Sequence, residues 1–234
     1  MMNISLVIPA YNEEKYIGAC LDSALKNNHG TFKEIIVVDN ASTDNTGDIA
    51  RKRPGVVVIR EERKGTGHAR QTGLEHATGE FVAYMDADTR VPEHWFDMVE
   101  AIFSKDPEIV LLSGPYRYYD SSWYKRWTQY FLWWISAPLV YRLVGYMALG
   151  GNIVVRREAL LQAGGISREI TFYGDDTDLA RKMHEVGKVL WRMDFFVYAS
   201  MRRFNNGGIF KTNLIYALNY IWPVVFNRPY TSGR

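Results

Sequence analysis

Short apolar runs alternate with helical segments over the first 115 residues, and this alternation limits the possible folds more than any other feature. Five runs have the length and composition of strands buried on both faces: Ile4–Ile8, Ile35–Val38, Val56–Ile59, Phe81–Met85 and Ile109–Leu112. Helices are predicted between them at Glu13–Lys26, Thr46–Lys52, His68–His76 and Pro92–Phe103. Asn12 is the expected N-cap of the first, and Pro92 the expected first residue of the last. The alternation favours an α/β fold whose central sheet is mostly parallel and flanked by helices.

Polar residues follow three of the predicted strands, where a parallel sheet usually binds its ligand. They are Pro9-Ala10-Tyr11-Asn12, Asp39-Asn40-Ala41-Ser42 and Asp86-Ala87-Asp88. Because Asn, Asp and Ser are also favoured in caps and turns, the first two clusters alone fit either a binding site or ordinary turns.

The third cluster is more specific, because two carboxylates are spaced one residue apart at the end of an apolar strand. On an extended backbone, residues i and i+2 point the same way, so Asp86 and Asp88 can address one bound cation together. Hard divalent ions such as Mg²⁺ prefer carboxylate oxygens and share their other sites with phosphates. We therefore predict a metal–phosphate site here.

Composition excludes several classes of protein. The 234 residues carry 28 basic and 26 acidic side chains, a net charge of +2, which does not suggest a nucleic-acid partner. Cys20 is the single cysteine, so an internal disulfide and a thiolate zinc site are excluded, and its helical neighbours predict a buried structural thiol. Neither a secretion signal nor an ordinary membrane-spanning helix is expected, which favours a cytoplasmic protein.

The chain changes character after Pro115. Aromatic residues crowd the segment Trp123–Leu149, and a second apolar segment covers Ile209–Phe226. Between them we predict strands at Ile153–Val155, Val189–Met193 and Phe196–Ser200, and a helix at Leu179–Val186 ended by Gly187. Aromatic rings with basic neighbours suit a peripheral contact with the inner face of a membrane. A hydrophobic core with a homodimer contact is the alternative.

Five motifs in register resemble those of the family 2 inverting glycosyltransferases, which have the GT-A fold. They are Val7-Ile8-Pro9-Ala10-Tyr11-Asn12-Glu13-Glu14, Val37–Thr46, Gly65-Thr66-Gly67-His68-Ala69-Arg70-Gln71-Thr72-Gly73, Met85-Asp86-Ala87-Asp88 and Gly174-Asp175-Asp176-Thr177-Asp178-Leu179. Gln71 stands where asparagine is more usual, and Asp175 replaces the customary glutamate. The resemblance runs from Ser5 to about Arg203.

The resemblance implies that the chain binds a nucleoside-diphosphate sugar. Asp39 would accept hydrogen bonds from the base, Tyr11 would pack near its ring, and Asp86 would lie near the ribose. Asp88 would ligate a Mg²⁺ or Mn²⁺ ion that neutralises the leaving diphosphate. The further nucleotide contacts implied are Pro9, Ala10, Glu13, Arg70 and Ala87, with Lys64 as a supplementary phosphate contact or a solvated surface charge.

Asp176 is the predicted general base, because an inverting displacement needs a carboxylate to receive the acceptor's proton. Repulsion among Asp175, Asp176 and Asp178 should raise the pKa of at least one of them. Read without the other motifs, these acids are an ordinary helix N-terminus. The remaining predicted contacts, to acceptor or phosphate, are Gly151, Asn152, Asp175, Arg202 and Arg203.

The sequence contains no internal repeat or low-complexity linker, so we predict one domain over 1–234. Residues 1–115 would bind the nucleotide sugar, 116–208 would hold the acceptor and catalytic groups, and 209–234 would form an amphipathic tail. The expected activity is metal-dependent transfer from a UDP- or GDP-linked sugar to a sugar or lipid-linked acceptor, in cell-envelope or surface polysaccharide or glycolipid synthesis. The alternative is a magnesium phosphohydrolase of the haloacid dehalogenase type, whose nucleophile motif Asp86-Ala87-Asp88-Thr89 resembles.

Overall fold

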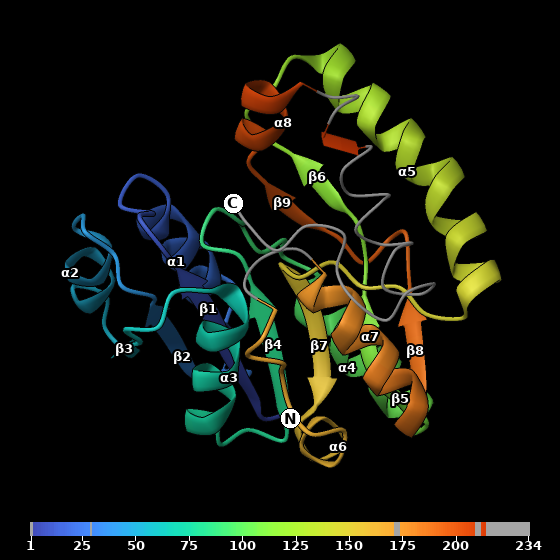
Figure 1. Cartoon of the computed structure of the whole chain (residues 1–234), viewed down its shortest axis with the longest axis horizontal. Coiled ribbons are helices and arrows are strands. Elements are labelled where there is room, and N and C mark those ends of the chain that lie inside the picture. Colours follow the sequence, from blue (N-terminus) through green and yellow to red (C-terminus); the bar gives the residue numbers. More distant parts are fainter. Residues whose placement is uncertain (1, 29, 171–173, 209–211, 214–234) are drawn as a thin grey trace.

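The computed structural model describes residues 2–28, 30–170, 174–208 and 212–213, and its centre is a seven-stranded sheet with helices on both faces (Figure 1). The strands are β1 (Ile4–Ala10), β2 (Phe32–Asp39), β3 (Val56–Arg60), β4 (Phe81–Met85), β5 (Ile109–Ser113), β6 (Tyr116–Tyr118), β7 (Asn152–Arg156), β8 (Lys188–Trp191) and β9 (Val197–Ala199). The helices are α1 (Ile17–Lys26), α2 (Thr46–Arg51), α3 (Thr66–His76), α4 (Trp95–Lys105), α5 (Trp123–Val144), α6 (Arg157–Gln162), α7 (Asp175–Val186) and α8 (Arg202–Gly207).

The sheet has the order β3-β2-β1-β4-β7-β5-β8 and is mostly parallel, which confirms the expected fold class. β1 pairs in parallel with both β2 and β4, so the ends of these strands meet at one edge. β7 is the exception and runs antiparallel to β4 and β5. As a result, the start of β7, with Gly150 and Gly151 just before it, lies at the same edge as Asp86, which follows β4.

Two apolar layers hold this sheet in place. One face packs against α1 and α4 around Leu6, Val99 and Trp95, and the other packs against α3 and α7 around Val7 and Met183. Cys20 lies in the first layer, where burial raises the pKa of its thiol to about 12. A neutral, enclosed thiol is a structural residue, as predicted.

Several element boundaries differ from prediction. α1 begins at Ile17, because Asn12 has a φ of 55° and its side chain accepts a hydrogen bond from the backbone N–H of Thr43 (2.8 Å) instead of capping a helix. α4 begins at Trp95 rather than Pro92, after a turn closed by the Trp95 N–H and the Pro92 carbonyl. β3 is an edge strand with Val57 exposed, so its apolar run is not buried on both faces.

The aromatic segment forms a 22-residue helix, α5, that stands over one end of the main sheet (Figure 1). It lies near a small sheet of β6 and β9, which runs into α8. Within the described residues, no helix is long and apolar enough to cross a membrane. The predicted tail, Ile209–Phe226, lies outside the described residues except at 212–213.

Candidate active site

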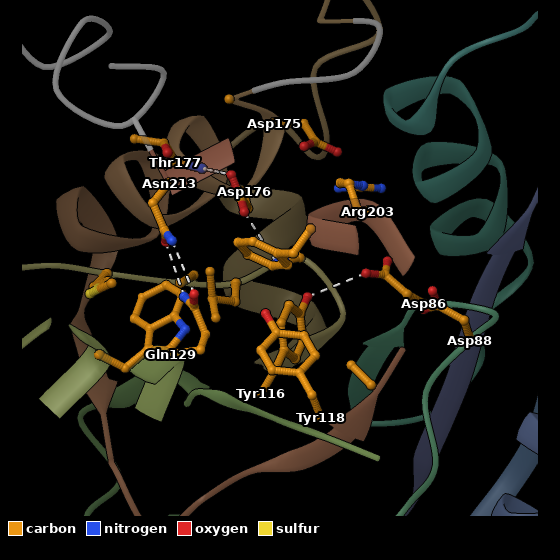
Figure 2. Close-up of a pocket in the computed structure, with 18 of the residues that line it drawn as sticks. Asp86, Asp88, Tyr116, Tyr118, Gln129, Asp175, Asp176, Thr177, Arg203 and Asn213 are labelled. Carbon is orange, nitrogen blue, oxygen red and sulfur yellow. Dashed lines mark hydrogen bonds between the residues drawn. The ribbon is translucent and has the colours of Figure 1, made fainter. Parts of the chain in front are cut away.

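A cavity of about 270 Å³ opens where the edge of the main sheet meets α5, α7 and α8 (Figure 2). Its walls differ in character. Asp86, Asp88, Arg70 and Arg203 line one part, whereas the inner face of α5 lines another with Leu132, Trp133 and Val140. Asp176 lies between the two parts in Figure 2. The cavity therefore combines a charged region and an apolar region around one carboxylate.

Asp86 and Asp88 form the charged part, as the strand pattern predicts. The Asp86 carboxylate accepts hydrogen bonds from the Tyr116 hydroxyl (3.3 Å) and from Arg70 Nη2 (3.5 Å). Asp88 Oδ2 lies 3.0 Å from Arg202 Nη2, which also donates to Glu13 Oε1 (2.5 Å). Burial, with a contribution from the charge of Asp86, raises the pKa of Asp88 to about 7. Burial therefore destabilises the ionised form of Asp88, and a nearby cation stabilises it.

These groups fit a hard divalent ion, but only in part. Among the described residues, no group of three or more His, Cys, Asp or Glu side chains could hold a metal by itself. Mg²⁺ and Mn²⁺ do not require three protein ligands, because they are often held by one or two carboxylates together with water and phosphate oxygens. Asp88, with Asp86 nearby, can supply that protein share.

The three acids at the start of α7 point to different partners. Asp175 is buried and pairs with the buried Arg70. Asp178 is turned to Arg181 (3.0 Å) and Lys182 (2.9 Å) on its own helix. Asp176 lines the cavity and accepts hydrogen bonds from the backbone N–H groups of Gly150 (3.2 Å) and Thr177 (2.9 Å). α7 thus begins at Asp175, four residues before the predicted start. Of the three acids in its first turn, Asp176 is the one that lines the cavity and has no ion-pair partner among the described residues.

Asp176 has the electrostatic character that a general base needs. Burial raises the pKa of Asp176 to about 6, and the negative charge of Asp175 contributes to this rise. The predicted repulsion is therefore present, although desolvation contributes more. A carboxylate with a pKa near 6 is ionised at neutral pH and still basic enough to take a proton.

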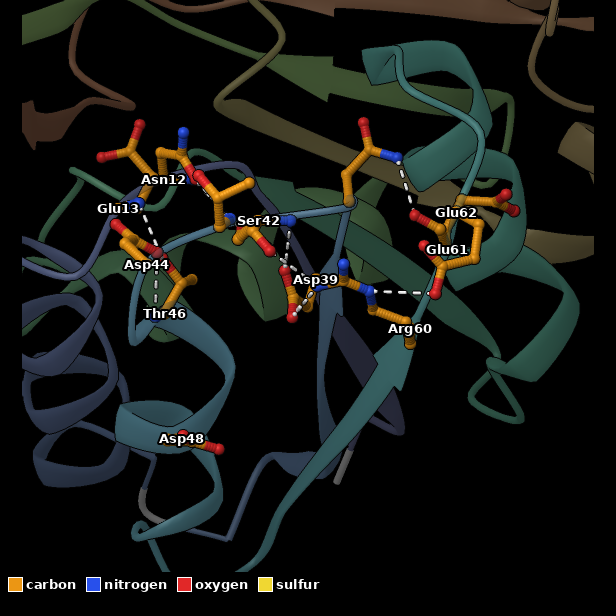
Figure 3. Close-up of polar contacts among 12 residues, drawn as sticks. Asn12, Glu13, Asp39, Ser42, Asp44, Thr46, Asp48, Arg60, Glu61 and Glu62 are labelled. Carbon is orange, nitrogen blue, oxygen red and sulfur yellow. Dashed lines mark hydrogen bonds and ion pairs between the residues drawn. The ribbon is translucent and has the colours of Figure 1, made fainter.

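A second polar cluster lies at the ends of β1, β2 and β3 (Figure 3). The buried Asp39 accepts hydrogen bonds from the Ser42 N–H (3.1 Å) and from Arg60 Nη1 (2.8 Å). Ala10 is the register partner of Asp39 on β1, and Tyr11 follows it. Lys64 Nζ lies 5.2 Å from the centroid of the Tyr11 ring. This cluster has both a ring surface and an acceptor–donor pair, as recognition of a base requires.

The structure corrects one predicted contact and qualifies others. Asn152 is fully buried, and its amide bonds to Trp95 Nε1 (3.1 Å), the Gly114 carbonyl (3.2 Å) and the Phe195 carbonyl (2.9 Å), so no polar atom is left for an acceptor. Gly151 is close to the charged region, since a Cβ there would lie 2.5 Å from an Asp86 oxygen. Ala87 is buried in the core, which leaves its backbone as the part available to a ligand.

Three site residues were missed from the sequence. Arg60 ends β3 beside Asp39, and the register of parallel strands could have suggested it. Tyr116 lies in β6, before the aromatic segment, and its hydroxyl contacts Asp86 and the Gly151 N–H (2.8 Å), two groups that are distant from it in the sequence. Gln129 lines the cavity from α5, and the even spread of apolar residues around that helix hid its inner face.

Comparison with known proteins adds a family and a fold. The family model described as Glycosyl transferase family 2 matches residues 5–163. Glycosyltransferase GlyG of Streptococcus pneumoniae serotype 4 is 35% identical over 125 residues, which are 51% of this chain and 40% of that protein. Poly(ribitol-phosphate) beta-N-acetylglucosaminyltransferase TarS of Staphylococcus aureus is 34% identical over 118 residues, or 48% of this chain and 21% of TarS. The chain thus spans less than half the length of these curated relatives.

Two solved structures share the fold over nearly the whole chain. The mannosyltransferase PcManGT from Pyrobaculum calidifontis, in complex with GDP-Man and Mn²⁺, has a TM-score of 0.72 at 21% identity, covering 95% of this chain and 64% of that one. Glucosyl-3-phosphoglycerate synthase from Mycobacterium tuberculosis, in complex with Mn²⁺, UDP and phosphoglyceric acid, has a TM-score of 0.68 at 22% identity, covering 96% of this chain and 78% of that one.

Proposed function

The chain belongs to glycosyl transferase family 2, and from that premise we propose that its cavity performs a metal-dependent, inverting sugar transfer. It is a glycosyltransferase of the GT-A type that uses a nucleotide sugar. The observation that carries the finer proposal is that one cavity is lined both by Asp86 and Asp88 and by Asp176, a carboxylate poised to accept a proton. The acceptor group is a hydroxyl or a phosphate.

We propose that residues 1–115 bind the donor through the ends of β1, β2 and β4. The base would lie against Tyr11, donate a hydrogen bond to Asp39 and accept one from Arg60, since these two side chains are already aligned as an acceptor beside a donor. Both uracil and guanine offer a carbonyl next to an N–H, so UDP and GDP donors both fit. Structural relatives bind one or the other.

A divalent ion, Mg²⁺ or Mn²⁺, would be held by Asp88 and would supply charge neutralisation for the departing diphosphate. The carboxylates present fit it, and two structural neighbours contain Mn²⁺. Arg202 contacts Asp88 and Glu13, and Arg203 lines the cavity, so α8 carries two cations toward the same phosphates. Arg70 is buried between Asp175 and Asp86 and positions both.

Asp176 would receive the proton of the acceptor group as that oxygen attacks the anomeric carbon from the side opposite the nucleotide. The Gly150 N–H and Thr177 N–H bonds hold its carboxylate in place. The two neighbouring carboxylates have partners within the protein, since Asp175 pairs with Arg70, and Asp178 pairs with Arg181 and Lys182. Asp176 is thereby left to the substrate. We propose that residues 116–208 form this acceptor and catalytic half.

The phosphohydrolase alternative is not favoured. The family match covers the strand that carries Asp86, and that strand is β4, preceded by three strand–helix units that build the Asp39 cluster. Asp175 and Asp176 begin α7, and the described residues 163–170 before them contain no strand, whereas the acidic motif of such phosphohydrolases normally follows an apolar one. The topology therefore supports a nucleotide site in the first 80 residues, a segment to which the phosphohydrolase alternative gives no role.

A thermal-shift panel with nucleoside diphosphates and Mn²⁺ tests donor binding. We expect either UDP or GDP to raise the unfolding temperature by several degrees in the presence of Mn²⁺, since a ligand at 100 times its Kd stabilises the fold by about 2.7 kcal/mol. The other nucleotide and ADP should have smaller effects. If no nucleoside diphosphate shifts the transition, with or without Mn²⁺, the proposed donor site is wrong.

We further propose that the protein acts at the inner face of a membrane, in cell-envelope or surface polysaccharide or glycolipid synthesis. The relative TarS, whose name specifies poly(ribitol-phosphate), supports an envelope role. The outer side of α5 supports membrane contact: it exposes large apolar residues over its length, and the helix contains three basic and no acidic residues. Those exposed residues include Trp123, Trp127, Phe131, Trp134, Leu139 and Leu143. Such a combination suits an anionic interface.

Flotation with liposomes tests this contact. We expect the protein to float with vesicles containing anionic lipid, and Trp127→Glu combined with Leu139→Glu to reduce the bound fraction at least fivefold, because each change places a charge in the apolar face. Light scattering of the free protein measures the alternative. A stable dimer that the double variant dissociates, with no flotation, would assign this face to a second copy of the chain.

A further inference from the structure

The cavity extends beyond what transfer to a plain sugar hydroxyl requires. From Asp176 it continues along the inner face of α5, where Leu132, Trp133 and Val140 line it, and reaches Met147 and Leu149 in the segment after that helix. Figure 2 shows Gln129 and Asn213 on the side of Asp176 away from Asp86 and Asp88. We propose that this extension binds the apolar chain of the acceptor, with the acceptor's polar head at Asp176. The inference rests on the proposed function and names the acceptor class.

The amide and hydroxyl side chains that line the extension already have protein partners, whereas Trp133 Nε1 is buried without a partner among the described residues. Gln129 and Asn213 exchange two reciprocal side-chain hydrogen bonds, each 3.0 Å long. Ser136 donates to the Leu132 carbonyl on its own helix (2.7 Å). Paired amides of this kind present little unmet hydrogen-bonding capacity, so they do not select a sugar, which needs many directional partners.

The spacing on α5 makes the extension a continuous surface. Gln129, Leu132, Trp133, Ser136 and Val140 line the cavity at intervals of three, one, three and four residues, which places them on one side of a helix. Trp133 stacks on Trp191 with 6.0 Å between ring centroids, so the wall is supported by β8. A wall held in this way is preformed and loses little order when an apolar chain covers it.

Charge divides the cavity along its length. Arg70, Asp86, Asp88, Asp176 and Arg203 belong to the part near the sheet edge, whereas Leu132, Val140, Met147 and Leu149 carry no charge. An amphipathic acceptor matches this division, because its head meets the catalytic carboxylate and its chain leaves water. A wholly polar acceptor would leave the apolar wall in contact with water. The apolar outer face of the same helix is consistent with supply of such an acceptor from a lipid surface.

A chain-length series tests the proposal without requiring transfer. Alkyl β-glucosides from methyl to octyl keep one neutral head and differ only in the chain, and their Kd values can be measured by ligand-observed NMR below their micelle thresholds, with saturating nucleoside diphosphate and Mn²⁺. Full burial of one methylene corresponds to about a fourfold change in Kd. We expect Kd to fall about two- to fourfold for each added methylene and then to level off once the cavity is filled.

Matched variants place the chain on one side of α5. Leu132→Gln should weaken octyl glucoside at least fivefold, and Val140→Thr, which keeps the side-chain volume and adds a hydroxyl, should weaken it less but measurably. Leu139→Gln is the control, because Leu139 is 57% exposed on the outer face and does not line the cavity. It should leave Kd within twofold. Each variant is first checked for an unchanged nucleotide-dependent thermal shift.

Two outcomes would overturn the proposal, and they differ from failure of the donor site. Kd values that do not depend on chain length would show that the cavity takes no apolar chain. A chain-length dependence that survives both inner variants would place the chain elsewhere. In both cases the nucleotide shift can persist and leave the proposed function intact. If the dependence holds but no nucleotide stabilises the protein, the proposed function fails and the acceptor assignment fails with it.

Discussion

Asp176→Asn should lower kcat for sugar transfer by about two to four orders of magnitude while leaving nucleotide binding within twofold of the wild type. The amide keeps the size of the side chain and its acceptor oxygen for the Gly150 and Thr177 N–H groups, but it cannot take a proton. Initial rates with a nucleotide sugar and acceptor measure the first effect, and the Mn²⁺-dependent thermal shift with nucleoside diphosphate measures the second.

Asp178→Asn is the matched control. Asp178 lies two residues along the same helix, but its carboxylate is paired with Arg181 and Lys182 outside the cavity. This variant should keep at least a third of the wild-type rate. Equal losses in the two variants would mean that the start of α7 was disturbed as a whole, and full turnover of Asp176→Asn would move the general base to another residue.

The raised pKa of Asp176 adds two further signatures to the same variant. At pH 7 a carboxyl with a pKa of about 6 is mostly ionised, and at pH 5 it is mostly protonated, so kcat/KM for the acceptor should fall about tenfold per pH unit below pH 6. The residual activity of Asp176→Asn should lack this acid limb. Wild-type activity that is constant down to pH 4.5 would exclude a base with this pKa.

Stability should change in the opposite sense to activity. Because the pKa of Asp176 is raised in the folded state, the unfolded chain loses this proton more readily, and folding stability falls as the pH rises from about 4 through 6. Asparagine resembles the neutral form, so Asp176→Asn should raise the unfolding temperature by a few degrees at pH 7, on the order of 1–3 kcal/mol. Gained stability together with lost turnover is typical of a group kept for chemistry.

Asp88→Ala should abolish the Mn²⁺-dependent part of nucleotide binding and lower transfer at least a hundredfold. Asp88 is the carboxylate best placed to hold an ion, since it pairs with Arg202 of α8, and burial together with the charge of Asp86 raises its pKa to about 7, so a cation would stabilise its ionised form. The thermal shift with nucleoside diphosphate, measured with Mn²⁺ and with EDTA, gives the metal-dependent part as a difference.

Asp97→Ala controls for general loss of acidic charge, because Asp97 is an exposed residue of α4 far from the cavity lining. It should behave as the wild type. A variant of Asp88 that retains the full difference between Mn²⁺ and EDTA would remove Asp88 from the metal role. Arg202→Ala is informative as a second change, because removal of the cation now 3.0 Å from Asp88 should strengthen the response to Mn²⁺ alone.

The parallel half of the fold was predictable because each of its strands is marked by a local run of apolar residues. Runs such as Ile35–Val38 and Phe81–Met85 are too apolar to lie anywhere but in a buried sheet, and each is followed by residues that can end a strand. Boundaries failed where tertiary contacts decided them. Asn12 was expected to cap a helix, but its amide binds the backbone of Thr43 in the next strand–helix connection, which no local pattern reveals.

The site was predictable in its acids and not in their partners. Asp86, Asp88 and Asp176 follow from motifs, but the direction of Asp175 depends on Arg70, which lies 105 residues away in the chain. Asn152 shows the converse error. It was predicted to contact the acceptor or a phosphate, whereas the antiparallel β7 turns the amide into the core toward Trp95. No local sequence pattern around Asn152 predicts that β7 runs antiparallel to its neighbours.

A crystal structure with Mn²⁺ and the nucleotide sugar selected by the thermal-shift panel tests the account most directly. We expect an anomalous Mn²⁺ peak at Asp88, the base at Asp39, and the anomeric carbon between the diphosphate and the Asp176 carboxylate. A sugar nucleotide bound with Asp176 on the same side of the anomeric carbon as the diphosphate, or a Mn²⁺ peak remote from Asp88, would contradict it.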